Sequence, residues 1–163
     1  MRRGQERCYI SNVMEIGKTS HSVYKIRYHM VTAVKYRKSL LNTDIEECIR
    51  ETLKGISERY EIMIDEIGFD QNHVHILCGA SPGLSPLRII GIIKSITARK
   101  VFENFPKLKK KELWGGEFWS DGKYIGTVGE ASSEKVIRTY IKNQSIDNKE
   151  KESRLKQLKL FNI

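Results

Sequence analysis

The stretch that decides the fold is QNHVHILCGA, residues Gln71–Ala80. Its apolar, β-branched character is typical of a buried strand. Side chains alternate between the two faces of a strand, so Val74 and Ile76 share one face and His73 and His75 share the other. The sequence therefore predicts a buried strand that presents two imidazoles together.

Two imidazoles at this spacing have Cα atoms about 6 to 7 Å apart, close enough to bind one divalent metal ion. His73 and His75 are the only close pair among the four histidines of the chain. A structural alternative is that one ring is exposed at the end of the sheet and the other makes a hydrogen bond in the core. A metal site would need a third ligand and a reacting group from elsewhere in the chain.

Hydrophobic periodicity and turn residues predict the elements around the histidine strand. Before it we expect a strand over His21–Val34, a helix from Asp44 to about Tyr60 that begins at the capping box Thr43-x-x-Glu46, and a strand over Glu61–Phe69 that forms a hairpin with it. After it we expect a helix from Ser85 to about Asn104 and a lysine-rich loop over Lys107–Lys111. A turn at Asp121-Gly122 then leads into a closing strand over Lys123–Val128. A last helix is expected from Ser132 or Ser133 to about Asp147. This order predicts an α+β, ferredoxin-like (RRM-like) antiparallel sheet with helices on one face.

The charge balance points to a polyanionic partner. The 163 residues include 29 Lys and Arg against 20 Asp and Glu, which gives a net charge of +9. Nucleic acid is the leading partner, and a membrane surface is the rival, but the basic residues are spread over several elements and do not form one cationic helix. The segment Lys35–Lys38, KYRK, suits phosphate neutralisation with base stacking, or is a solvated strand end.

Cysteine usage and hydropathy favour a cytoplasmic protein. Cys8, Cys48 and Cys78 are an odd number without C-x-x-C spacing, which argues against disulfides and against a zinc finger. No apolar run is long enough for a signal peptide or a membrane span. We expect reduced thiols and no membrane association.

Tyr140 and Gln144 lie four residues apart on the last helix, so their side chains project from one face. If this helix packs over the histidine strand, Gln144 can offer its carbonyl oxygen as a third ligand beside Tyr140. The alternative is that Tyr140 is an aromatic residue at the edge of the core and Gln144 a solvated polar residue.

Three motifs in order resemble the small single-tyrosine HUH transposases of bacterial and archaeal insertion sequences, a group that includes the REP-associated tyrosine transposases. They are H-V-H at 73–75, LWGGEFWSDGKYIGTVG at 113–129, and IRTYIKNQ at 137–144. The resemblance covers roughly residues 20–144. It implies a catalytic domain over 20–147 whose last helix carries the nucleophilic tyrosine. Charge without a clear period predicts an N-terminal arm over 1–19, and the high charge of residues 148–163 predicts a tail.

The resemblance also implies a mechanism. His73, His75 and Gln144 would bind one Mg²⁺ or Mn²⁺ ion, which polarises the scissile phosphate of single-stranded DNA. Tyr140 would attack it, giving a covalent 5′-phosphotyrosine and a free 3′-hydroxyl without a nucleotide cofactor. One departure is Asn72, which stands where members of the family often have an acidic residue directly before the first histidine.

By the same resemblance, the protein is a homodimer that recognises imperfect hairpins in single-stranded DNA, and the tyrosine helix can sit against the histidines of either subunit. The candidate DNA contacts are Lys25, Arg27, Lys35, Arg37, Arg88, Lys94 and Arg99. Two alternatives stay open: a domesticated relative that cleaves repeated palindromes, and a non-catalytic module that binds single-stranded nucleic acid.

Overall fold

The computed structural model describes residues 17–18, 21, 23–129 and 132–143. Within them a main sheet has the strand order β4-β5-β3-β6, and all neighbouring strands are antiparallel. Its strands are β3 (Tyr28–Val34), β4 (Met63–Phe69), β5 (His73–Gly79) and β6 (Trp119–Thr127), and a separate antiparallel pair is formed by β1 (Gly17–Lys18) and β2 (Val23–Tyr24). The helical elements are η1 (Lys35–Arg37), α1 (Thr43–Tyr60), α2 (Pro86–Asn104), α3 (Pro106–Lys111) and α4 (Ser132–Asn143).

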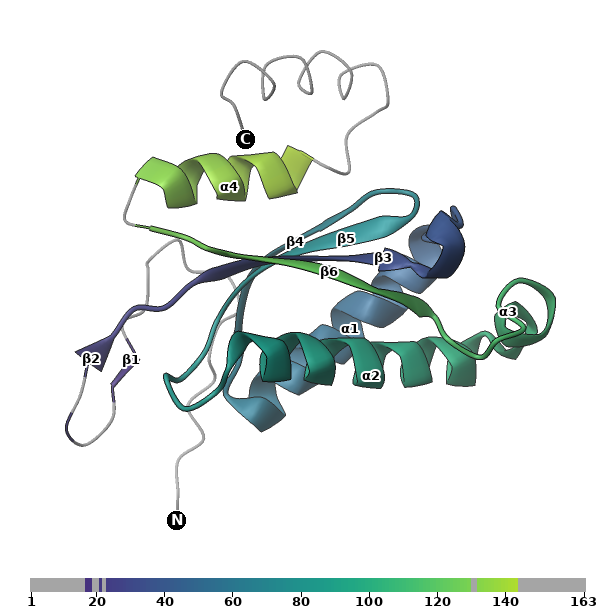
Figure 1. The fold of residues 1–163 in the computed structure, drawn as a ribbon, viewed down its shortest axis with the longest axis horizontal. Coiled ribbons are helices and arrows are strands. Elements are labelled where there is room, and N and C mark those ends of the chain that lie inside the picture. The colour runs from purple at the N-terminus through teal and green to yellow at the C-terminus, as the bar shows by residue number, and fades with distance from the viewer. Residues whose placement is uncertain (1–16, 19–20, 22, 130–131, 144–163) are drawn as a thin grey trace.

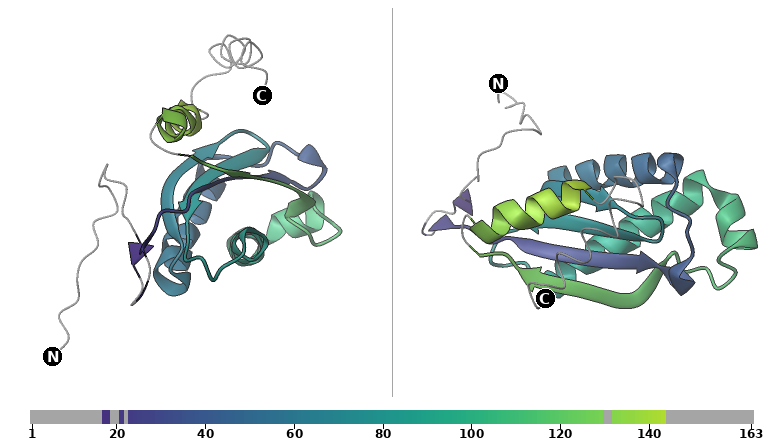
Figure 2. Two further views of the ribbon diagram at one scale, coloured as in Figure 1. Left: turned by 60° about the vertical axis from the view of Figure 1, so that its left-hand side comes forward. Right: turned by 90° about the horizontal axis from the view of Figure 1, so that it is seen from above.

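The helices lie on both faces of the main sheet. α1 and α2 cover one face, and α4 lies across the other (Figures 1 and 2). The first arrangement confirms the ferredoxin-like prediction, and α4 is the additional C-terminal helix. None of the helices within the described ranges is long and apolar enough to span a membrane.

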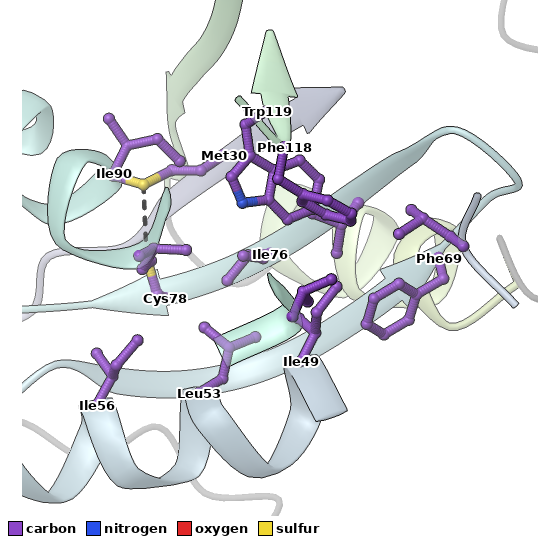
Figure 3. Close-up of a cluster of buried hydrophobic side chains, with 14 of the residues drawn as sticks. Met30, Ile49, Leu53, Ile56, Phe69, Ile76, Cys78, Ile90, Phe118 and Trp119 are labelled. Atoms are coloured by element: carbon purple, nitrogen blue, oxygen red, sulfur yellow. Dashed lines mark hydrogen bonds between the residues drawn. The ribbon is translucent and has the colours of Figure 1, made fainter. Parts of the chain in front are cut away.

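The core lies between the sheet and the helices α1 and α2. Met30 of β3 and Ile76 of β5 point into it and are at most 1% exposed, as are Ile49 of α1 and Ile93 of α2. Figure 3 shows this packing, with the Sγ atom of Cys78 lying 3.8 Å from the sulfur of Met30. Because burial of one such side chain contributes about 1.5 to 3 kcal/mol, this layer fixes which face of each strand is turned away from the helices.

The prediction of one continuous strand over His21–Val34 is wrong, because the structure has two separate strands there. β2 pairs with β1, whereas β3 pairs with β5 and β6, and residues 25–27 separate the two strands. The strand breaks where its hydrogen-bonding partners change. Gly17–Lys18 of the predicted arm form β1, and the rest of the arm and the tail over 148–163 lie outside the described residues.

Three other local predictions are corrected. Asn42, rather than Thr43, caps α1, because its Oδ1 accepts a hydrogen bond from the Ile45 N–H at 3.1 Å. The predicted loop over Lys107–Lys111 is helical, with Pro106 in the first turn of α3, where its missing N–H costs nothing. The predicted turn at Asp121-Gly122 lies inside β6, where the register with β3 shifts between Thr32 and Val34, as in a β-bulge.

The cap of α1 can be tested by substitution. Asn42→Ala removes the side-chain acceptor for a backbone N–H, so we expect the free energy of unfolding to fall by about 1 kcal/mol. Thr43→Ala is the matched control and is expected to change stability by much less. Urea denaturation of both variants checks this, and a larger loss for Thr43→Ala would restore the capping box that the sequence suggested.

Candidate functional site

Three histidine side chains meet on the face of the sheet that α1 and α2 do not cover. His73 and His75 come from β5 and His29 from β3. The rings of His29 and His75 are nearly parallel, with centroids 5.1 Å apart, and the ring centroids of His73 and His75 are 5.0 Å apart. The shared face predicted for His73 and His75 is thus the face that carries the cluster.

His29 is a member of this cluster that the sequence analysis did not single out. Its Nε2 lies 2.9 Å from Nδ1 of His75, within hydrogen-bond distance. In the sequence, the alternation of side chains along the strand already places His29 on the face opposite Met30. This alternation was the signal that could have assigned His29 to the face of the histidine cluster. The contact itself depends on the register of β3 on β5, in which His29 pairs with Leu77 and Val31 pairs with His75.

Burial favours the neutral form of two of these imidazoles, His75 and His29. His75 is 6% exposed, and burial, followed by the neighbouring His29 and His73, lowers the pKa of His75 to about 3. Burial also lowers the pKa of His29 below its ordinary value. A neutral imidazole keeps a lone pair on one ring nitrogen, and this is the form that binds metal ions.

Hydrogen bonds set which nitrogen of each ring faces the site. The Oδ1 atom of Asn72 lies 2.8 Å from Nδ1 of His73 and can accept its N–H, which places the lone pair of His73 on Nε2. The Nδ1 atom of His75 is engaged with His29, and Nε2 of His75 is buried without a hydrogen-bond partner among the described residues. An unpartnered buried nitrogen is costly unless something binds it.

The histidines fit a metal site only in part. An orphaned imidazole nitrogen on His75 and an oriented ring on His73 are a suitable pair of donors. Within the described ranges, however, no group of three or more His, Cys, Asp or Glu side chains is arranged to hold a metal ion. The predicted third ligand, Gln144, lies outside the described residues.

Tyr140 of α4 lies beside the histidine cluster. Its ring centroid is 5.4 Å from that of His75 and 6.5 Å from that of His29, and both contacts are edge-on. Tyr124 of β6 also contacts the cluster, with its ring centroid 5.7 Å from that of His29. The structure therefore brings a phenol next to the imidazole pair within one chain.

Close packing and ion pairs hold α4 over the sheet. Gly68 of β4 pairs with His75, and a Cβ atom on Gly68 would lie 2.9 Å from Cγ2 of Ile141 and clash with the Ile141 carbonyl oxygen. Glu66 of β4 contacts two side chains of α4, Arg138 at 3.4 Å and Lys142 at 3.2 Å. The absence of a side chain at position 68 lets the helix approach near enough for its tyrosine to reach the histidines.

The predicted DNA contacts differ in their exposure and in their partners. Lys25, Arg37 and Arg88 are exposed, Arg99 pairs with Glu103, and Nζ of Lys94 donates to the Ser120 carbonyl oxygen. Lys35 pairs with Glu117 at 2.5 Å and Asp121 at 3.1 Å. Arg27 is corrected from a DNA contact to an interior residue, because it is 4% exposed and its Nε lies 2.6 Å from Oδ2 of Asp65.

Comparison with known proteins adds to this geometry. The model of the family described as "Transposase IS200 like" matches residues 22–144. The ISDra2 transposase TnpA of Deinococcus radiodurans is 30% identical over 136 residues, which cover 83% of this chain and 96% of that protein. The transposase for insertion sequence element IS200 of Salmonella typhimurium is 29% identical over 130 residues, which cover 80% of this chain and 84% of that protein.

Two solved structures are similar. A crystal structure of a Deinococcus radiodurans transposase superposes with a TM-score of 0.65 at 30% identity and covers 81% of this chain and 100% of that one. The structure of a REP-associated tyrosine transposase bound to a REP hairpin has a TM-score of 0.51 at 13% identity, covering 87% of this chain and 72% of that one. At that identity the second likeness supports the fold alone.

The docking of α4 can be tested at Gly68. We expect Gly68→Ala to displace α4, because the new methyl group would collide with the backbone of Ile141. Amide hydrogen exchange over residues 134–143 should accelerate while α1 stays protected. Gly55→Ala is the matched control, because a Cβ at that position on α1 has nothing within 4 Å. Equal exchange of α4 in both variants would show that the close approach does not hold the helix.

Proposed function

The chain belongs to the family of IS200-like transposases, and from that premise we propose that it cleaves and rejoins single-stranded DNA at the ends of an insertion sequence. The proposed intermediate is a 5′-phosphotyrosine on Tyr140. The observation that supports it is the 5.4 Å separation between the rings of Tyr140 and His75, on a face of the sheet that the core helices leave uncovered.

In the proposed step the phenol oxygen of Tyr140 attacks the scissile phosphorus. The new bond joins this oxygen to phosphorus, the bond from phosphorus to the 3′-oxygen breaks, and the phenol proton leaves to solvent. The released 3′-oxygen takes up a proton and becomes a 3′-hydroxyl. Rejoining is the reverse reaction with the 3′-hydroxyl of another strand, so one phosphodiester is exchanged for another and no nucleotide cofactor is consumed.

His73 and His75 are the residues that we propose hold a Mg²⁺ or Mn²⁺ ion, with Gln144 as the third ligand. Such an ion would polarise the phosphate and favour the ionised form of the phenol, whose ordinary pKa near 10 makes it a weak nucleophile at neutral pH. The chain itself holds these rings in place: His29 contacts His75, and Asn72 accepts a hydrogen bond from His73. Fixed rings reduce the reorganisation needed when substrate arrives.

The proposed substrate is single-stranded DNA that carries an imperfect hairpin. The net charge of +9 supports binding of a polyanion, and the REP-associated tyrosine transposase that shares this fold is described as bound to a REP hairpin. We also propose a homodimer, in which α4 can serve the histidines of its own subunit or those of its partner. The described contact of Tyr140 with His75 corresponds to the first of these placements.

The chemistry can be tested with a hairpin-containing single-stranded DNA, Mn²⁺ and denaturing electrophoresis. We expect the unmodified protein to form a covalent adduct, and Tyr140→Phe to lose it entirely because the nucleophilic oxygen is gone. Tyr60→Phe, a tyrosine at the end of α1, is the matched control and should form the adduct normally.

Two further arms separate the possible results. Replacing Mn²⁺ by EDTA, or His75 by Ala, should abolish the adduct while the DNA still binds. A protein that shifts the DNA in native gels but forms no adduct in any arm would be a non-catalytic binding module. An adduct that persists in Tyr140→Phe would place the nucleophile elsewhere.

The role of Asn72 can be tested by metal binding without turnover. We expect Asn72→Leu to weaken Mn²⁺ binding about 10- to 100-fold, because the acceptor that orients His73 is lost. Asn72→Asp should bind Mn²⁺ more tightly than the natural chain, because a carboxylate is the stronger acceptor. Titration calorimetry of the apoprotein measures both, with Gln71→Ala as an exposed neighbouring control; equal affinities in all variants would remove Asn72 from the site.

A further inference from the structure

Two aromatic side chains stand exposed at one end of the molecule, away from the core. Trp114 is 81% exposed, the highest value among the large apolar side chains of the described residues, and Tyr36 is 56% exposed. The other tryptophan, Trp119, is 5% exposed, and its Nε1 donates to Thr97. Exposure of large aromatic rings costs free energy in water and is a signal of a binding surface.

The backbone at Tyr36 is strained in the same place. Tyr36 has φ 60° and ψ 18°, and Arg37 follows it with φ 55°. Bulky residues rarely adopt the left-handed region, and two in succession must be held by their surroundings. The result is a sharp turn after β3 that leaves the Tyr36 ring exposed.

Ion pairs and a backbone bond tie this turn to the segment that carries Trp114. Lys38 pairs with Glu112 at 2.9 Å, and Lys35 pairs with Glu117 at 2.5 Å. The Lys35 N–H also donates to the Phe118 carbonyl oxygen at 2.8 Å. These contacts, on both sides of Trp114, hold the two segments together.

The Tyr36 side chain lies against the turn that carries Trp114. A Cβ atom on Gly115, the residue after Trp114, would lie 3.8 Å from the Tyr36 hydroxyl. The ring of Tyr36 therefore reaches the turn on which Trp114 sits. We call Tyr36 and Trp114 the aromatic platform.

Positive charge surrounds the aromatic platform. The charges of Lys35 and Lys38 are taken up by the ion pairs above, but Arg37 and three exposed lysines of the adjoining helix α3 make no ion pair with any described residue. These lysines are Lys107, Lys110 and Lys111. Exposed rings with unpaired cations match a nucleic acid strand, whose bases stack while its phosphates are neutralised.

The platform lies at the end of the sheet where the histidine site begins. Ala33 of β3 pairs with His73, and the Val34 N–H donates to the Asn72 carbonyl oxygen at 2.8 Å. Tyr36 follows Ala33 by three residues, so their Cα atoms are at most about 11 Å apart. Figure 1 shows α3 at this same end of the sheet. The platform and the histidine site therefore lie at the same end of the sheet.

We propose that Tyr36 and Trp114 form a stacking site for unpaired bases of single-stranded DNA, outside the catalytic centre. This proposal rests on the proposed function, because it takes the substrate to be single-stranded DNA. Arg37 and the α3 lysines contact the phosphates on either side of the stacked bases. The platform holds the single-stranded flank of the substrate, whatever its sequence, since every base has a face to stack.

The experiment uses a fluorescein-labelled oligothymidylate of twelve nucleotides, with EDTA present so that no chemistry occurs. Fluorescence anisotropy gives the Kd for the full chain and its variants. We expect Trp114→Ala and Tyr36→Asn each to weaken binding about 5- to 150-fold. Asn replaces the ring at position 36 while tolerating its left-handed backbone, and thermal unfolding checks that both variants stay folded.

Matched controls define the role of the rings. Trp114→Phe and Tyr36→Phe keep an aromatic face and should retain most of the affinity. Leu87→Ala removes another exposed apolar side chain, 63% exposed near the start of α2, and should leave the Kd unchanged. Oligothymidylate should also quench the exposed Trp114, whereas Trp119, which is buried, cannot be reached.

The outcomes separate this proposal from the function on which it rests. Unchanged Kd values in both ring-removal variants, equal binding of a duplex, or tighter binding of oligouridylate would overturn the platform as a single-stranded DNA site, even if the natural chain forms the covalent adduct with hairpin DNA. Weakened binding in the variants of a protein that forms no adduct would uphold the platform and reject the catalytic proposal.

Discussion

The site depends on one constraint: side chains along β5 point alternately into the core and to the opposite face of the sheet. Val74 and Ile76 are each 1% exposed in the core beneath the sheet, so the residues between and before them must point to the other face. A slip of one residue would bury both imidazoles against α1 and α2 and expose the aliphatic side chains. The hydrophobic layer thus positions two polar rings that contribute nothing to it.

Helix α4, which lies over the histidine strand, is held by weaker interactions than the strands of the sheet. Ile141 of α4 is fully buried, and its backbone approaches Gly68 on the strand next to the histidines. The ion pairs of Glu66 with Arg138 and Lys142 add to this contact, but partly exposed pairs contribute only about 0 to 1 kcal/mol each. The buried Ile141 side chain, the close approach to Gly68 and these ion pairs together hold α4 on the sheet. In the proposed function this is the helix that carries the nucleophile.

Features that follow from the periodicity of the sequence were predicted, whereas contacts that depend on how the strands pair were missed. The order of strands and helices and the shared face of His73 and His75 follow from alternation and helical spacing, and the structure confirms them. His29 could not be assigned to the site, because only the register of β3 on β5 brings its Nε2 to His75. Arg27 was taken for a surface cation for a similar reason: its partner, Asp65, lies 38 positions away on another strand. At the start of α1, Asn42 and Thr43 are both good caps, so local pattern alone did not separate them.

The buried, neutral imidazole of His75 affects both the stability of the fold and the capacity of the histidine cluster to bind a ligand. Burial lowers the pKa of His75 to about 3, so the ring is neutral at pH 7, and its Nε2 is left without a hydrogen-bond partner among the described residues. For folding alone this is unfavourable, since an unsatisfied buried nitrogen costs about 1 to 3 kcal/mol. An apolar side chain at position 75 would avoid that cost. The imidazole at position 75 therefore agrees with the proposed function, in which a cation bound at this nitrogen would bring a phosphate next to Tyr140.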